Sequence, residues 1–459
     1  MKWKDKLKFF QKQNLFKIII FLLFILSSIL KQPWHDELYT QYVVKKTPVE
    51  IFNEIKKDNY PPLYYFLIHF LTEPFNHNMF SIRFLSSIFV FLSGIILIKT
   101  IKNEYGLFVL LFPIPFYFSS EARAYSLIIF LSSLFFYEIL SKKRVFLIVI
   151  YLILLSYTHY ISFLYFPYLI FLIIYEKKKR YILGSIVYLI SVSPLYFLFT
   201  AQPKESIFWA SPFLNWKSIF NFFSNLGPNL FENYVYNFFP SIPVFIFFIL
   251  NIYVIISNFK TKPLIKILIP FSLNIFFLFF LSYTYKNIYT PSRTESFFFI
   301  PFSLFFINFI SKKFKIIKYF KIFYALILIF SLILIFLSFT RRMPINKEIE
   351  QIINYVKADT RVYVIGYWRL TIEYIFEKKG IQNKVMTFPI SQNEHQGWYY
   401  LDKFEEEDLD WFLKNIILSK SSYLVLWDKR NPFINEILPL FPQDIKIYGT
   451  EKFYFVVKD

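Results

Sequence analysis

The chain has 459 residues, of which 56% are hydrophobic and 23% aromatic, and it contains no cysteine. A soluble protein of this length could not bury so much apolar surface, so we expect a lipid bilayer to surround much of it, and disulfides and thiolate metal sites are excluded. The net charge of +20 lies entirely in residues 1–340, in short runs between apolar segments, which argues against the continuous basic stripe of a nucleic-acid-binding protein.

The first element is an apolar run that ends at Leu30 and follows six lysines within the first 17 residues. This charge pattern is that of a signal peptide, but Pro33-Trp34-His35-Asp36 follows and offers no small-x-small cleavage site. We therefore predict an uncleaved first membrane-spanning helix with its N-terminus in the cytoplasm.

Ten further apolar segments of roughly 16–20 residues are long enough to span a membrane, which makes about eleven with the first. They lie at 81–100, 107–120, 125–141, 145–160, 162–175, 181–199, 241–257, 265–283, 295–310 and 322–340. With these spans, the basic loops all fall on the side of the N-terminus: Lys99/Lys102, Lys142 to Arg144, Lys177 to Arg180, Lys260/Lys262/Lys266 and Lys312 to Lys321. This alternation predicts a multi-pass protein of the plasma (inner) membrane, with the C-terminal part extracytoplasmic.

Two long outer segments interrupt the spans. Residues 33–80 contain the amphipathic piece 61–70, which is too short to span and is expected to lie in the membrane interface. Residues 200–240 are rich in Trp, Pro and Asn, and Trp209 and Trp216 are typical of side chains at the headgroup level.

From about residue 344 the composition changes, which predicts a transmembrane domain at 1–340 and a separate domain at 341–459. Short β-like runs at 361–365, 423–427 and 453–457 alternate with helical, charged stretches at 370–379, 404–417 and 432–439. This order predicts a small extracytoplasmic α/β domain, and without a Gly-rich phosphate loop we assign it no nucleotide.

The adjacent carboxylates Asp36 and Glu37 follow the first span directly. A carboxylate near a low-dielectric surface can accept a proton from a hydroxyl nucleophile or hold a divalent cation, so Asp36 is a candidate base and a candidate metal ligand. Alone, the pair is more often a solvated loop feature. No certain cofactor follows from it.

Three arginines lie at the outer ends of spans, where the positive-inside bias predicts few basic residues: Arg83, Arg123 and Arg293. An arginine fork binds phosphate oxygens, although snorkelling to the interface is an equal alternative for each residue alone. Glu121 and His159 belong to the same outer face. Acidic and basic groups from separate helices beside the lipid boundary suit a lipid-linked phosphate ester.

Several ordered motifs resemble the GT-C membrane glycosyltransferases, and most closely the bacterial relatives of protein O-mannosyltransferases and aminoarabinose transferases. They are Pro33-Trp34-His35-Asp36-Glu37-Leu38-Tyr39-Thr40, Asn59-Tyr60-Pro61-Pro62-Leu63-Tyr64-Tyr65, Ser81-Ile82-Arg83-Phe84-Leu85-Ser86-Ser87, Ser120-Glu121-Ala122-Arg123-Ala124-Tyr125-Ser126-Leu127 and Thr158-His159-Tyr160. Pro291-Ser292-Arg293 looks like a later arginine of the family, but Thr294 stands where an aromatic residue is expected.

The resemblance implies a membrane all-α fold of GT-C type, a polyprenyl-phosphate sugar donor, and a lipid, glycan or protein acceptor outside the cytoplasm. It implies that Asp36 is the base or a metal-associated carboxylate and that Glu37 positions it. Arg123 and Arg293 would hold the donor phosphate. The same donor site is expected to include Arg83, Glu121, Tyr125 and His159.

Two other classes of protein remain as alternatives. A transporter or lipid flippase would need charged groups near the bilayer midplane and often has two similar halves, whereas the charges here cluster at outer helix ends and no internal repeat is visible. A membrane anchor for a binding domain would need neither the acidic pair nor the arginines.

Overall fold

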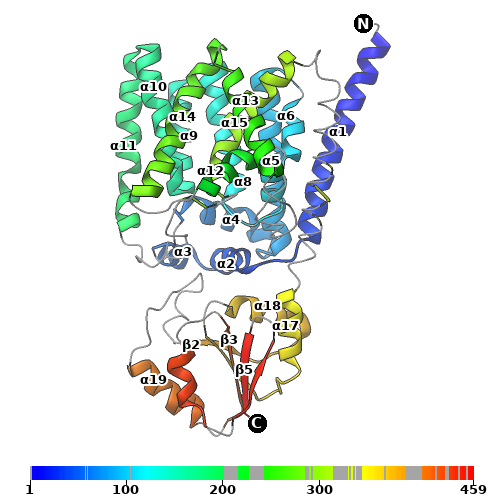
Figure 1. Ribbon diagram of the computed structural model, residues 1–459, viewed down its shortest axis with the longest axis vertical. Coiled ribbons are helices and arrows are strands. Elements are labelled where there is room, and N and C mark those ends of the chain that lie inside the picture. The colour runs from blue at the N-terminus through cyan, green and yellow to red at the C-terminus, as the bar shows by residue number, and fades with distance from the viewer. Residues whose placement is uncertain are drawn as a thin grey trace.

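A computed structural model describes residues 3–200, 216–226, 242–313 and 344–458, together with positions 329, 332–333 and 336. Short gaps within these ranges are 57, 59, 104, 260, 285–288, 291–292, 366–367, 389–405, 419–420, 430–433, 443–444 and 451–452. The molecule has two units, a helical bundle above and a small α/β unit below (Figure 1). The predicted span 322–340 and Trp209 therefore lie outside the described residues, apart from the single helical positions named above.

Helix α1 (Trp3–Leu30) runs along one side of the bundle, and the chain then bends by 94° into α2 (His35–Val44). Two more short helices, α3 (Pro48–Ile55) and α4 (Leu63–Thr72), follow α2 along the lower end of the bundle (Figure 1). Thr47 and Glu50 form a capping box that starts α3. The first outer segment therefore folds as short helices, as the sequence predicts for residues 61–70.

Four described helices are long and apolar enough to cross a membrane, or up to five if the bent pair α1–α2 counts as one span. These four are α5 (Met79–Ile101), α8 with its π-helical last turn η3 (Tyr125–Lys142), α11 (Lys179–Thr200) and α14 (Lys262–Thr284). Shorter apolar helices stand beside them: α9 (Val145–Thr158), η4 with α10 (Tyr160–Glu176), α13 (Ile242–Ser257) and α15 (Glu295–Lys313). The helix α12 (Trp216–Asn225) packs on α13.

The predicted span 107–120 is wrong as a single helix. The chain forms three short pieces instead, α6 (Tyr105–Phe108), η2 (Val109–Leu111) and α7 (Pro113–Phe118). Pro113 and Pro115 lack the backbone N–H that a continuous helix would need, and Phe112 is extended before them. All three pieces are buried among α5, α8 and α15.

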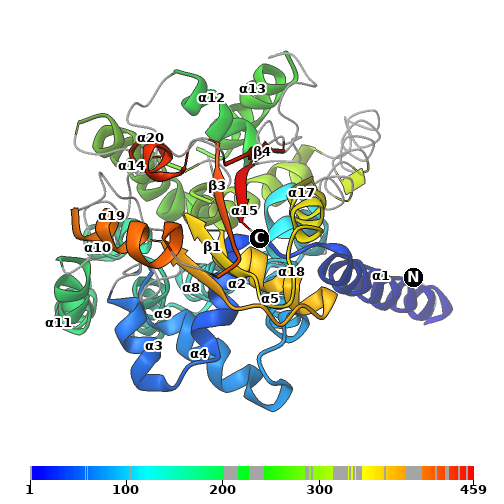
Figure 2. The ribbon, with the colours of Figure 1, turned by 90° about the horizontal axis from the view of Figure 1, so that it is seen from below.

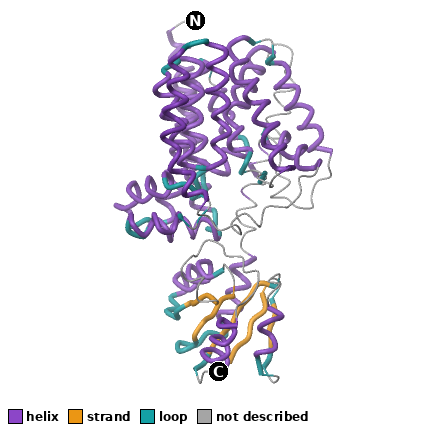
Figure 3. Tube along the Cα trace, turned by 90° about the vertical axis from the view of Figure 1, so that its left-hand side faces the viewer, coloured by secondary structure: helices purple, strands orange, loops and turns teal. Residues whose placement is uncertain are grey.

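One end of the bundle collects the loops that the sequence marks as basic. Glu176 lies 3.6 Å from the Nζ atom of Lys143 and 3.9 Å from that of Lys178, and it also pairs with Lys266. Loops from three parts of the chain therefore meet at the same end. The N-terminus and the C-terminus lie at opposite ends of the molecule (Figure 3).

The C-terminal unit is a five-stranded mixed sheet in the order β2-β1-β3-β5-β4. The strands β2 (Val385–Phe388), β1 (Arg361–Ile365) and β3 (Tyr423–Asp428) are parallel, and β5 (Phe453–Lys458) and β4 (Ile447–Gly449) continue the sheet antiparallel. Flanking helices are α17 (Pro344–Ile353), α18 (Arg369–Lys379), α19 with η7 (Glu406–Ile417) and α20 with η8 (Ile434–Leu440). The three predicted strands form, and helices form in the three stretches predicted to be helical. Strands β2 and β4 were not predicted.

Helix α18 joins the two units. It packs on α2, and Leu370 belongs to the core of the bundle, with Tyr374 partly buried against it. Ile372, Ile375 and Phe376 of the same helix belong to a core of the C-terminal unit. Seen from below, the sheet and α18 lie across the middle of the bundle, near α2 (Figure 2).

Candidate active site

The acidic pair lies in the first turn of α2, where the positive end of the helix dipole favours carboxylates. Trp34 precedes the helix in an extended conformation and starts it. Successive residues of a helix point about 100° apart, so adjacent side chains face different neighbours. Glu37 is completely buried among the helices, whereas the Asp36 side chain is 20% exposed.

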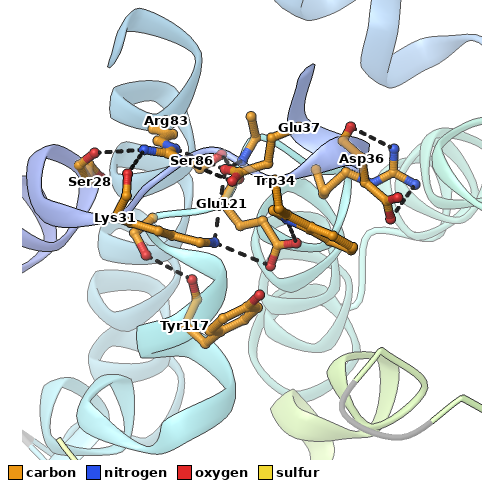
Figure 4. A network of polar contacts seen from close by, with 12 residues as sticks. Ser28, Lys31, Trp34, Asp36, Glu37, Arg83, Ser86, Tyr117 and Glu121 are labelled. Atoms are coloured by element: carbon orange, nitrogen blue, oxygen red, sulfur yellow. Dashed lines mark hydrogen bonds and ion pairs between the residues drawn. The ribbon is translucent and has the colours of Figure 1, made fainter. Parts of the chain in front are cut away.

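Glu37 is the centre of a buried ion cluster. Arg83 on α5 donates from Nε and Nη2 to its two carboxylate oxygens at 2.8 and 2.7 Å, which is the bidentate geometry of a strong pair. The remaining terminal nitrogen of Arg83, Nη1, donates to the carbonyls of Ser28 and Lys31 at the end of α1 (Figure 4). The cluster thus ties α1, α2 and α5 together.

Glu37 also accepts a hydrogen bond from the backbone N–H of Ala122 at 2.9 Å. Two serines of α5 support the same loop, because Ser87 donates to the carbonyl of Ser119 at 2.8 Å and Ser86 donates to that of Glu121 at 2.7 Å. Buried backbone groups outside helices need such partners. The loop that carries Arg123 is therefore held directly against the residue that follows Asp36.

Asp36 lies between two arginines. Its Oδ2 atom is 2.9 Å from Nη2 of Arg293 and 3.8 Å from Nη2 of Arg123. Arg123 also donates from Nη1 to the Asp36 carbonyl at 3.3 Å. The residues come from α2, the α7–α8 connection and the start of α15, so the fold brings together segments about 257 positions apart in the chain.

The arginines set the ionisation of both carboxylates. Burial alone would raise the pKa of Asp36, but the charges of Arg123 and Arg293 outweigh burial and hold its pKa below the usual range. Burial opposes ionisation of Glu37 as well, yet Arg83 and Lys31 lower its pKa to about 2. Both side chains are therefore anionic at neutral pH.

Aromatic side chains form a wall beside Arg123. Its guanidinium lies 4.4 Å from the ring centre of Tyr60, whose hydroxyl is 2.6 Å from that of Tyr125. The His159 ring packs edge-on against Tyr60 at 4.9 Å and against Phe297 at 5.0 Å. Such contacts fix the position of a guanidinium while leaving its charge available to a ligand.

His159 lies between α9 and η4, at the wall. Its Nδ1 atom accepts a hydrogen bond from the backbone N–H of Ile161 at 3.1 Å. An imidazole that accepts through Nδ1 is neutral and carries its proton on Nε2, so His159 is a hydrogen-bond donor through that atom.

Two of the residues predicted to contact the donor phosphate lie in different surroundings from the rest. Arg83 is only 3% exposed and its donors are committed to Glu37 and to backbone carbonyls, so it is placed to organise the loop rather than to reach a phosphate. Glu121 is buried and accepts from Nε1 of Trp34 at 3.1 Å, and as a carboxylate it would repel an anion. Asp36, Arg123, Tyr125, His159 and Arg293 are brought together.

Three further residues lie in the same region, and no role was predicted for them from the sequence: Lys31, Trp34 and Tyr60. Trp34 and Tyr60 stand in the quoted motifs, and their aromatic character alone did not distinguish them from the many other rings. Lys31 carried a usable signal, because it is a basic residue at the outer end of a span, like the three arginines.

The surroundings of Asp36 do not fit a divalent cation. Two guanidinium groups lie within 4 Å of its carboxylate, and they would repel a metal ion. No group of three or more His, Asp or Glu side chains with metal-binding geometry occurs among the described residues. We therefore derive no step through a metal.

Two solved structures resemble the chain over nearly its whole length. The crystal structure of ArnT from Cupriavidus metallidurans bound to undecaprenyl phosphate matches with a TM-score of 0.57 and 10% identity, covering 96% of this chain and 97% of that one. The same protein in the apo state matches with a TM-score of 0.55 and 12% identity over the same shares. No family model and no curated protein matches the sequence.

The chain has a GT-C glycosyltransferase-like fold. The motif resemblance and the likeness in three dimensions lead independently to this GT-C-like fold, although so few residues are identical. At this level of identity the likeness concerns the fold, so the chemistry has to be argued from the residues of this chain.

Proposed function

We propose that the chain is an integral-membrane glycosyltransferase that moves a sugar from a polyprenyl-phosphate donor to a hydroxyl of a lipid, glycan or protein acceptor. The observation that carries the proposal is the position of Asp36 between Arg123 and Arg293, beside an aromatic wall at one end of an apolar bundle. The undecaprenyl phosphate bound to the structurally similar ArnT supports the donor class.

The charges of this site match those of the proposed reaction. With an ionised carboxylate, Asp36, Arg123 and Arg293 together carry a charge of +1. A prenyl-phosphate sugar is a phosphodiester with one negative charge, so its binding would neutralise the set. In a low-dielectric site such matching avoids burying an uncompensated charge.

The transfer preserves this balance. The acceptor oxygen would attack the anomeric carbon as the bond from that carbon to the phosphate oxygen breaks, and the electron pair would stay on the phosphate. Asp36 would take the acceptor proton, which raises the charge of the residue set to +2 while the leaving prenyl phosphate becomes a dianionic monoester. Attack opposite the leaving phosphate would invert the anomeric centre.

The roles of the other residues follow from what each can donate. Arg123 and Arg293 would exchange their contact with Asp36 for the phosphate oxygens, and Arg293 has the more exposed side chain, at 25% against 6%. His159 through Nε2 and Tyr125 through its hydroxyl would donate to the sugar or phosphate. The reaction would take place on the extracytoplasmic side of the plasma membrane.

A panel of radiolabelled prenyl-phosphate sugars, offered to the purified protein with and without a chelator, tests the proposal. We expect transfer from at least one donor, insensitivity to the chelator, and a loss of at least about 1,000-fold in kcat for Asp36→Asn, because the amide cannot take the proton. Glu407→Asn, at an exposed position of α19, is the control. Full activity of Asp36→Asn would refute the assigned role of the carboxylate.

A further inference from the structure

A second set of residues lies beside the Asp36 site: Lys31, Trp34 and Glu121. Lys31 ends the α1 region, Trp34 precedes α2, and Glu121 follows α7. Figure 4 shows these three side chains together, and one further residue links them to Asp36.

That residue is Arg293. Its guanidinium lies 5.5 Å from the centre of the Trp34 ring while its Nη2 contacts Asp36 at 2.9 Å. The cation is thus supported by a carboxylate and by an aromatic face. When the carboxylate contact is given up to a phosphate, the contact with the ring continues to support the guanidinium.

The orientation of the indole is in turn fixed by Glu121. Nε1 of Trp34 donates to Oε1 of Glu121 at 3.1 Å, which provides a partner for the partly buried indole N–H. The other oxygen of Glu121 lies 3.8 Å from Nζ of Lys31. The ring therefore cannot turn without leaving a buried carboxylate with fewer partners.

Lys31 completes the chain of contacts. It is fully buried, and its Nζ lies 3.9 Å from Glu37 and 4.3 Å from the ring centre of Tyr117. An ammonium group is costly to bury, and a hydrophobic residue would be easier to accommodate at this place. A buried lysine shared by two carboxylates favours the one arrangement of side chains in which all three charges have partners.

We infer that Lys31, Glu121 and Trp34 are positioning residues that hold Arg293 in place for the donor phosphate. This inference rests on the proposed function. It differs from a purely structural role, because it predicts that a change at the indole or at Glu121 alters the environment of Asp36 without unfolding the protein.

The test measures how fast a water-soluble carbodiimide labels Asp36 in the full-length, ligand-free protein in lipid nanodiscs, by peptide mass spectrometry. Trp34→Phe removes the indole N–H and keeps a ring, and Glu121→Ala removes its acceptor. Loss of a well-placed cation raises the protonated, reactive fraction of a carboxyl about tenfold, so we expect labelling to rise about tenfold in both variants. Affinity for added undecaprenyl phosphate should fall in parallel.

Matched controls separate positioning from general damage. Trp411→Phe changes a partly buried tryptophan of the C-terminal unit, and Glu138→Ala removes a buried carboxylate paired with Arg144 at the far end of α8. Both should leave Asp36 labelling unchanged. If Glu121→Ala unfolds, Trp34→Phe alone decides the matter.

The outcomes distinguish this inference from the proposed function. Labelling of Asp36 at the wild-type rate in folded Trp34→Phe overturns the positioning role even if the wild type transfers sugar. Faster labelling in a protein that transfers no sugar from any donor supports the positioning role and overturns the proposed function.

Discussion

Asp36 and Glu37 are neighbours in the chain and have opposite tasks in the fold. One helical step turns Glu37 into the bundle, where Arg83 holds both of its oxygens, and leaves Asp36 partly exposed between two arginines. Glu37 has no spare capacity to accept a proton, since every contact stabilises its anion. In the proposed reaction, Asp36 would become a base once a phosphate draws the arginines away.

The ionisation of Glu37 predicts how stability depends on pH. Its pKa is about 2 in the folded protein against 4.5 ordinarily, so its contribution is fully present above about pH 5 and is lost as the pH falls from about 4.5 towards 2. Linkage puts this contribution at about 3 kcal/mol. We expect the unfolding temperature of the detergent-solubilised protein to drop across this range.

Glu37→Gln should remove this component of the pH dependence and lower the unfolding temperature at pH 7, because Arg83 would lose its charged partner. Glu407→Gln, at an exposed position of α19, should behave like the wild type. An equally steep acid transition in Glu37→Gln would show that other groups control it.

The sequence allowed the residues of the proposed site to be singled out more readily than their partners in the fold. Asp36, Arg123 and Arg293 could be singled out because charged residues at outer span ends conflict with membrane burial and with the positive-inside bias. Whether an arginine faces a ligand or a buried carboxylate depends on side-chain directions in three dimensions. For that reason the pairing of Arg83 with Glu37 could not be predicted from the sequence.

At the scale of elements, the interrupted segment from α6 to α7 determines where the loop with Glu121 and Arg123 lies. Its short pieces end at the loop that carries Glu121 and Arg123, and close packing against α5 sets their depth. Two glycines permit this packing: a Cβ atom at Gly94 would collide with the side chain of Leu110, and one at Gly106 would lie 2.7 Å from the backbone nitrogen of Ile98. Hydropathy alone predicts one span here, because it does not register broken helices.

Gly106→Ala is therefore expected to displace α6 and to reduce both stability and activity. The contacted atom belongs to the backbone of α5 and cannot rotate away, so we expect a loss of about 1–3 kcal/mol. Gly184→Ala is the matched comparison, because its Cβ would meet only side-chain atoms, of Val149 at 2.9 Å and of Val145 at 3.2 Å, which can adjust. The unfolding temperature and kcat of the two variants provide the measurement, and equal effects would contradict the argument.

At the scale of the whole molecule, apolar helices and a small sheet could be predicted from the sequence, whereas the junction between them could not. Apolar segments and the change of composition near residue 344 mark the bundle and the α/β unit. Strand β4 has only three residues, and β2 has four, too few for a clear alternation. The two units meet at α18, which has one apolar face in the core of the bundle and another in a core of the C-terminal unit. A sequence pattern does not show which partner covers each face.

Because α18 packs on α2, the C-terminal unit can influence the helix that carries Asp36. Leu370→Asp would place a charge in the apolar contact with the bundle, while the α18 residues that face the sheet stay unchanged. We expect faster hydrogen exchange in α2 and a decrease in kcat of about tenfold, since small displacements of catalytic groups strongly reduce rates. Leu418→Asp, at a position 67% exposed in the same unit, should leave both unchanged. If Leu370→Asp loosens α2 and leaves kcat unchanged, the C-terminal unit contacts α2 without affecting the reaction. If kcat falls while hydrogen exchange in α2 is unchanged, the unit acts by another route, such as contact with the acceptor.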